Sequence, residues 1–97
     1  MKAYELLADP AKWAQGYEAY NANGEGCMAT SLDAVKWCAM GAIEKVHYPY
    51  SSTRDAAYDK LLNYLFVYTG YRFVGNWNDA KTTTHADVVR VLKELDL

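Results

Sequence analysis

The dipeptide Asn23-Gly24 limits the folds open to this chain more than any other short stretch. Both positions of a two-residue hairpin turn need positive φ, and Asn-Gly is a pair that adopts it readily. We therefore predict two antiparallel strands, over residues 17–22 and 25–29, with Tyr20 opposite Cys27. A lone hairpin is only marginally stable in water, so this one has to pack against other elements.

The spacing of apolar residues predicts that most of the remaining chain is helical. Residues 32–46 carry an apolar stripe at helical spacing, formed by Leu32, Val35, Ala39, Ala42, Ile43 and Val46. Gly41 lies in the middle of this predicted helix, where glycine costs on the order of 1 kcal/mol relative to alanine. Glycine at such a position indicates close approach by another element.

A longer helix is predicted over residues 53–69. The pattern Ser52-x-x-Asp55 is typical of a helix start, and Gly70 provides the stop. The second half of this helix, "LLNYLFVY", is apolar on nearly all sides. Such a helix is normally covered on several sides, so we expect it at the centre of the fold.

Shorter helices are predicted near the two ends of the sequence. The first covers residues 2–8, after which Asp9-Pro10 starts a new turn that carries Trp13 toward the core. The last covers residues 85–95 and begins at the capping box Thr84-x-x-Asp87. The stretch before it, "YRFVGNWND", is expected to be irregular or briefly extended.

These elements predict a mainly α fold of the α+β class, with about four short helices around a central helix and one β-hairpin. The chain has 97 residues, of which 52% are hydrophobic. That length is sufficient for a core without a disulfide or a metal. We expect one small globular domain over residues 1–97.

Charge and apolar content exclude several classes of function. Ten Lys and Arg against twelve Asp and Glu leave a net charge of −2, without a basic run. Nucleic-acid binding is therefore disfavoured, unless basic residues from distant segments converge on one face. The first residues have no signal-peptide pattern, and the longest apolar run is too short to span a bilayer. We expect a cytoplasmic protein with no membrane contact, no cofactor and reduced thiols.

Cys38 is the first candidate for chemistry, because a cysteine nucleophile needs a base and His47 follows nine residues later. On one continuous helix this spacing turns the two side chains apart and separates them by roughly 13 Å along the axis. No helix start is expected near Cys38 to lower its pKa. We interpret it as a small buried residue, while a dyad with His85 stays open. The cysteine and histidine spacings form no metal signature.

The second candidate is the stretch "NWNDAKTTTH", residues 76–85. Its polar side chains Asn78, Asp79 and His85 are candidates for a binding pocket. In the structural interpretation, Trp77 anchors the core and Asn78-Asp79 form a turn. Asp79 is the residue that the structural interpretation explains least.

Tyrosine provides the third candidate. Five of the nine tyrosines fall in expected loops or in the hairpin, namely Tyr17, Tyr20, Tyr48, Tyr50 and Tyr71. Tyrosine is enriched in protein interfaces, although partly buried tyrosines with the hydroxyl at the surface would have the same pattern. We expect the segment Tyr48-Pro49-Tyr50 to be rigid and exposed, so it is the best candidate for such a contact face.

Several short motifs follow one another along the chain: Trp13 and Gly16, Trp37-Cys38 with Gly41-Ala42, Trp77-Asn78-Asp79, a threonine and a Val-rich last helix. In this order they resemble a family of small uncharacterised bacterial and phage proteins, a domain of unknown function. The resemblance covers most of the chain, although members often have several basic residues where this chain has only Lys81. It implies an intracellular protein carried by a phage or mobile element, and it implies no activity, cofactor or catalytic residue.

We therefore expect a small non-enzymatic module that binds a protein partner, such as a phage-encoded modulator of a host protein. The alternative is a small-molecule-binding or hydrolytic protein that uses a polar pocket around Asp79 and His85, with or without Cys38. A flat face of exposed tyrosines would favour the first hypothesis, and a concave polar pocket would favour the second.

Overall fold

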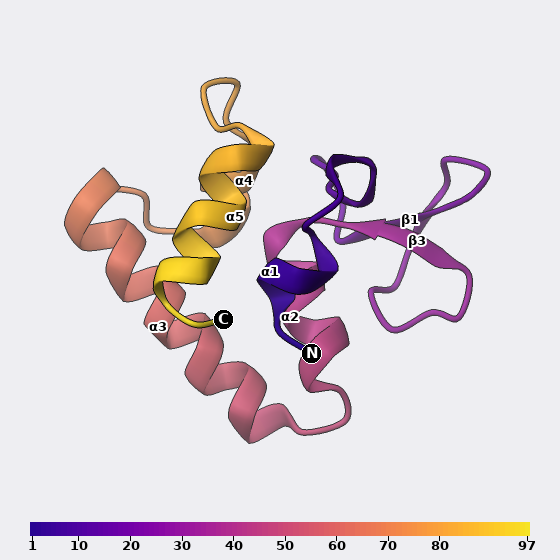
Figure 1. The fold of residues 1–97 in the computed structure, drawn as a ribbon, viewed down its shortest axis with the longest axis horizontal. Helices are drawn as coiled ribbons and strands as arrows, with labels where there is room; N and C mark the ends of the chain where they lie inside the picture. Colours follow the sequence, from indigo (N-terminus) through magenta and orange to yellow (C-terminus); the bar gives the residue numbers. More distant parts are fainter.

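The structure, a computed structural model, describes residues 1–97. Its helices are α1 (Ala3–Leu6), α2 (Ala39–His47), α3 (Ser51–Thr69), α4 (Val74–Asp79) and α5 (His85–Glu94), with one 3-10 turn, η1 (Pro10–Lys12). Its strands are β1 (Ala19–Asn21), β2 (Gly26–Cys27) and β3 (Ala34–Trp37). Figure 1 shows the sheet at one end of the molecule, α3, α4 and α5 at the other, and α1 and α2 between them. The predicted class, mainly helical α+β, is confirmed. None of the helices has a stretch that could span a lipid bilayer.

Helix α2 is the central helix of the fold. It packs against α1, α3, α4 and β3. Its buried residues are small, apart from Ile43. A Cβ added at Gly41 would lie 2.0 Å from the backbone oxygen of Glu18, so the chain approaches the helix closely at this point. The close approach predicted at Gly41 is therefore confirmed.

Helix α3 runs along one side of the molecule instead of through its centre (Figure 1). Gly70 ends it in the left-handed conformation, as predicted, with φ +79°. Leu61 and Leu65 are fully buried, whereas Phe66 and Val67 are 55% and 71% exposed. The predicted central position is wrong, because only one stripe of the apolar residues of α3 faces the core.

Strand β3 takes the place of the first part of the helix predicted over residues 32–46. Leu32 is fully exposed and Val35 is 44% exposed, so neither belongs to an inward apolar stripe. Trp37 is buried, and its indole N–H donates to the carbonyl oxygen of Ala29 at 2.9 Å. Because β3 pairs with β1, the sheet has three strands in the order β2-β1-β3 and is more than the predicted hairpin.

The hairpin turns at the predicted place, but its register differs by one residue. Tyr20 pairs with Gly26 and not with Cys27. The loop comprises residues 22–24, and Gly24 is its one residue with positive φ, +80°. A three-residue hairpin loop ends in one left-handed residue, whereas a two-residue turn of type I′ needs two. The extra loop residue moves the second strand by one position.

Helix α4 forms in the stretch that was expected to be irregular. Its N-cap residue, Phe73, makes no side-chain cap, and its sequence VGNWND has low helix propensity. Trp77 is only 4% exposed and Asn78 is fully buried. The helix is therefore stabilised by burial of these two side chains and not by the helix propensity of its residues.

The two predicted capping patterns have different outcomes. The backbone N–H of Asp87 donates to Oγ1 of Thr84 at 3.2 Å, and the N–H of Thr84 donates back to Oδ2 of Asp87 at 3.0 Å. This capping box starts α5 as predicted. The start predicted at Ser52 is wrong, because α3 already begins at Ser51 and its N-cap, Tyr50, makes no side-chain cap.

Replacing Gly41 with Ala should destabilise the fold, because the added methyl group would overlap the carbonyl of Glu18. Overpacking of this kind costs about 1–3 kcal/mol or more, which outweighs a gain of roughly 1 kcal/mol in helix propensity. Gly75→Ala is the matched control, since Gly75 lies in α4 and a Cβ there meets no atom within 4 Å. Thermal unfolding should give a lower Tm for Gly41→Ala and an unchanged or higher Tm for Gly75→Ala. Equal melting temperatures would contradict the close contact.

Candidate functional site

The candidate residue Asn78 is a buried junction between three segments of the chain. Its Oδ1 accepts hydrogen bonds from the indole N–H of Trp13 at 2.8 Å and from the backbone N–H of Ala39 at 2.9 Å. Its Nδ2 donates to the carbonyl oxygen of Ala14 and to Oδ1 of Asp79, both at 3.0 Å. A side-chain amide has two donor hydrogens and two acceptor lone pairs. Every hydrogen-bonding position of Asn78 is therefore occupied within the fold.

The end of α4 also holds the segment of residues 13–16. Oδ1 of Asp79 accepts a hydrogen bond from the backbone N–H of Gly16 at 2.9 Å. The side-chain amide of Gln15 donates to the carbonyl oxygens of Asn78 at 2.9 Å and Ala80 at 3.3 Å. Each residue from 13 to 16 is thus bonded to residues 78–80. Asp79 is exposed at the surface but takes part in this contact.

His85, the first residue of α5, bonds to a different part of the molecule. Its Nε2 donates to the carbonyl oxygen of Leu7 at 2.6 Å, which ties α5 to the end of α1. The centroid of its ring lies 6.1 Å from that of Trp13, at an interplanar angle of 54°. Trp13 therefore contacts both Asn78 and His85, whereas Asp79 and His85 share no hydrogen bond. The structure joins Asn78 and Asp79 by a hydrogen bond and places Asn78 and His85 against one indole, but His85 bonds elsewhere.

Cys38 is buried, with 8% of its surface exposed, and it is the N-cap residue of α2. The expectation that no helix start lies near it is wrong, because the true helix begins one residue later. Its Sγ accepts a hydrogen bond from the N–H of Gly41 at 3.3 Å. Burial nevertheless raises the pKa of the Cys38 thiol above its ordinary value. His47 is the last residue of α2, so the helix holds the two side chains at opposite ends.

The five candidate tyrosines divide among three places. Tyr17 and Tyr20 lie at the hairpin, with ring centroids 6.4 Å apart. Tyr48 and Tyr50 lie in the turn between α2 and α3, where they are 67% and 69% exposed and line a hollow of about 180 Å³. Tyr71 lines another hollow, beside α5. The structure brings Tyr48 and Tyr50 together but does not join all five tyrosines around one hollow.

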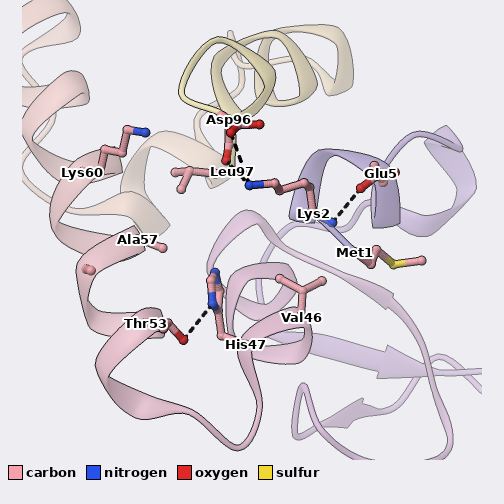
Figure 2. A pocket seen from close by; sticks show the side chains of 11 residues that line it. Met1, Lys2, Glu5, Val46, His47, Thr53, Ala57, Lys60, Asp96 and Leu97 are labelled. Atoms are coloured by element: carbon pink, nitrogen blue, oxygen red, sulfur yellow. Dashed lines mark hydrogen bonds and ion pairs between the residues drawn. The ribbon is translucent and has the colours of Figure 1, made fainter.

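A larger hollow, of about 540 Å³, lies where α1, α2 and α3 meet the C-terminal residues (Figure 2). Nζ of Lys2 lies 3.4 Å from Oδ2 of Asp96. Nδ1 of His47 lies 3.0 Å from Oγ1 of Thr53, whose hydroxyl donates to the carbonyl oxygen of Tyr50 at 3.0 Å. These polar groups pair with one another, and no group of three or more His, Cys, Asp or Glu is arranged to hold a metal ion.

An apolar groove between α3 and α4 was not predicted from the sequence. It has a volume of about 210 Å³ and is lined by Met40, Tyr58, Leu62, Arg72, Phe73, Val74 and Gly75. The guanidinium carbon of Arg72 lies 5.7 Å from the ring centroid of Phe66, so this exposed ring lies beside the groove. The sequence did indicate apolar residues on nearly all sides of the second half of α3. We interpreted them as buried in the core, whereas some of them line this groove.

Asn78→Ala should cost about 3 kcal/mol or more, because each buried group left without a partner costs about 1–3 kcal/mol. The groups concerned are the N–H groups of Trp13 and Ala39 and the carbonyl of Ala14. Asp79→Asn is the control, since its side-chain oxygen can still accept from the Gly16 N–H. An isosteric change at this exposed position should cost less than about 1 kcal/mol. Urea unfolding measures both, and equal losses would show that the carboxylate charge holds the junction.

Burial predicts that Cys38 reacts slowly with thiol reagents in the native state. In a Cys27→Ser variant, an aromatic disulfide reagent should label Cys38 far more slowly than it labels the same chain in denaturant. Because the pKa of the Cys38 thiol is raised, the labelling rate should still be rising at pH values above the ordinary pKa of a thiol. The reciprocal Cys38→Ser variant is the control, because Cys27 is only half-buried and should react faster. Labelling of native Cys38 at the rate of a free thiol would refute its protection.

We compared the sequence with known protein families, curated proteins and solved structures. The model of a family described as "Family of unknown function (DUF6197)" matches residues 1–95. No curated protein and no solved structure matches the chain. Because the family match extends over nearly all of the sequence, the chain belongs to the family of unknown function DUF6197.

Proposed function

We propose that this chain is a non-enzymatic protein-interaction module that binds a short peptide segment of its partner in the groove between α3 and α4. The observation that carries the proposal is the exposure of large apolar side chains along this groove. Phe66, Phe73 and Met40 are 55%, 66% and 42% exposed. Apolar side chains that adjoin one another at the surface are typical of interaction sites, whereas scattered ones are not.

The lining of the groove indicates the chemistry of the partner. Arg72 is its only charged residue and forms no ion pair within the chain. Burial raises the pKa of Tyr58 to about 12, so its hydroxyl stays neutral and donates to the carbonyl oxygen of Met40 at 3.1 Å. The groove therefore suits a peptide that carries a large apolar side chain next to an Asp or Glu, whose carboxylate would pair with the guanidinium.

We further propose that the chain is encoded by a phage or another mobile element. Its partner would then be a host protein, and it would act in the cytoplasm. The support for this proposal is the resemblance to small bacterial and phage proteins described above. The net charge of −2 favours a protein partner over a nucleic acid.

The alternative, small-molecule binding or hydrolysis in a polar pocket around Asp79 and His85, has weaker support. Asn78 is saturated by hydrogen bonds within the fold, and Nε2 of His85 bonds to the carbonyl oxygen of Leu7. Loss of a measured reaction in Asp79→Asn, at an unchanged melting temperature, would favour this alternative.

A library of random peptides, displayed on yeast and selected on the immobilised chain, tests the groove. Selected peptides should carry Phe, Trp, Leu, Ile or Met next to an Asp or Glu. Phe73→Ala should weaken their binding by about tenfold or more, the effect expected of an interface hot spot. Arg72→Glu should also weaken it, because the new carboxylate repels the acidic residue of the peptide. Isothermal titration calorimetry measures both effects.

Val67→Ala is the control, because Val67 is a 71% exposed apolar residue of α3 that does not line the groove. Its affinity for the selected peptides should equal that of the unmodified chain. Peptides that bind the Phe73→Ala variant with full affinity would place the site elsewhere. A library from which no sequence is enriched would refute the proposal that the groove binds peptides.

A further inference from the structure

A second hollow lies on another face of α3, between this helix and α5. Tyr64 and Tyr68 line it. Tyr64 is two positions from Leu62, which lines the groove, and Tyr68 is two positions from Phe66, which lies beside the groove against Arg72. At about 100° per residue, two positions turn a side chain almost to the opposite side of a helix. The volume of this tyrosine-lined hollow is about 380 Å³, which lies in the range of small-ligand sites.

Two nearly buried residues that line this hollow have a polar group without a partner within the chain. Trp77 is 4% exposed and Thr83 is 8% exposed, and both side chains line the hollow. The indole N–H groups of Trp13 and Trp37 have acceptors within the chain, but neither the N–H of Trp77 nor the hydroxyl of Thr83 has a partner there. Since no fully buried polar atom lacks a partner, both groups reach the solvent. Both groups are therefore free to bond to water or to a ligand that enters the hollow.

The rest of the lining combines aromatic faces with a balanced pair of charges. The ring centroids of Tyr64 and Tyr68 lie 4.7 Å apart, and Tyr68 is 72% exposed. Nη2 of Arg90 lies 3.8 Å from Oδ1 of Asp87. The backbone N–H of Thr84 holds the pKa of Asp87 below its usual range, so the carboxylate is charged at neutral pH and offsets the guanidinium. The hollow therefore provides flat apolar surface, donors and acceptors without a net charge.

We propose that the tyrosine-lined hollow binds a neutral sugar ring. A pyranose has an apolar C–H face that fits the ring of Tyr68, and its hydroxyls can pair with Trp77, Thr83 and the Asp87–Arg90 pair. A phosphate or carboxylate ligand is disfavoured, because the carboxylate of Asp87 lies beside the only cation of the lining. The proposal does not depend on peptide binding in the groove, because the two sites share no lining residue.

Nuclear magnetic resonance of the ¹⁵N-labelled chain tests this site directly, because each of the three tryptophans gives one indole N–H signal. Glucose, galactose, mannose and N-acetylglucosamine are the probes, each added to about 50 mM, which saturates even a site with a Kd of about 1 mM. At least one sugar should shift the signal of Trp77 in a saturable way. The signals of Trp13 and Trp37, which are bonded inside the protein, should stay in place.

Tyr68→Ala should raise the Kd of that sugar about tenfold or more, because it removes the exposed aromatic wall without disturbing the core. Tyr48→Ala is the matched control, since Tyr48 is equally an exposed tyrosine, 67% exposed, but does not line the hollow. It should leave the Kd unchanged. The absence of a Trp77 shift with all four sugars would overturn the proposal. So would full sugar affinity in Tyr68→Ala, or a Trp77 shift caused by adenosine or uridine and by none of the sugars.

Discussion

The hydrogen bonds of the Asn78 side chain are the interaction on which the rest of this structure depends. One amide joins Trp13 and Ala14, the first turn of α2 and the end of α4, using all four of its hydrogen-bonding positions. An apolar residue of the same size would leave buried donors and acceptors without partners, which costs more than burying it would gain. The network also stabilises α4, since this helix ends at Asp79 and residues 78–80 bond to residues 13–16.

The position of α2 is the second consequence. At its N-terminus, the N–H groups of Ala39 and Gly41 donate hydrogen bonds to Oδ1 of Asn78 and to Sγ of Cys38, so the helix starts against the junction and not in solvent. Gly41, one turn into the helix, then allows the carbonyl of Glu18 to approach. Together these contacts place the sheet and the end of α4 at the start of α2, while α3 packs against the helix from another side (Figure 1). Helix α2 can therefore be packed on several sides because its buried residues are small.

The apolar character of α3 on nearly all sides now has a structural explanation. One stripe, with Leu61 and Leu65, is buried against the core. Other apolar and aromatic residues line the groove toward α4 and the hollow toward α5. On the proposals made here, these two surfaces would serve a peptide and a sugar ring. A hydrophobic pattern reports which residues avoid water, but it does not distinguish a core partner within the chain from a partner outside it.

The sequence by itself determined the features that depend on neighbouring residues. The capping box of Thr84 and Asp87, the left-handed stop at Gly70, the turn near Gly24 and the mainly helical α+β class all follow from interactions within a few positions. The sequence named Asn78, Asp79 and His85 as candidates, but it did not give their hydrogen-bond partners. The hydrogen bond between Trp13 and Asn78 joins residues 65 positions apart. Strand β3, helix α4, the central position of α2 and the lining of both surfaces likewise depend on partners distant in the chain. Only the tertiary structure decided these, because a buried polar group or an exposed ring has a defined role only after its neighbours in space are known.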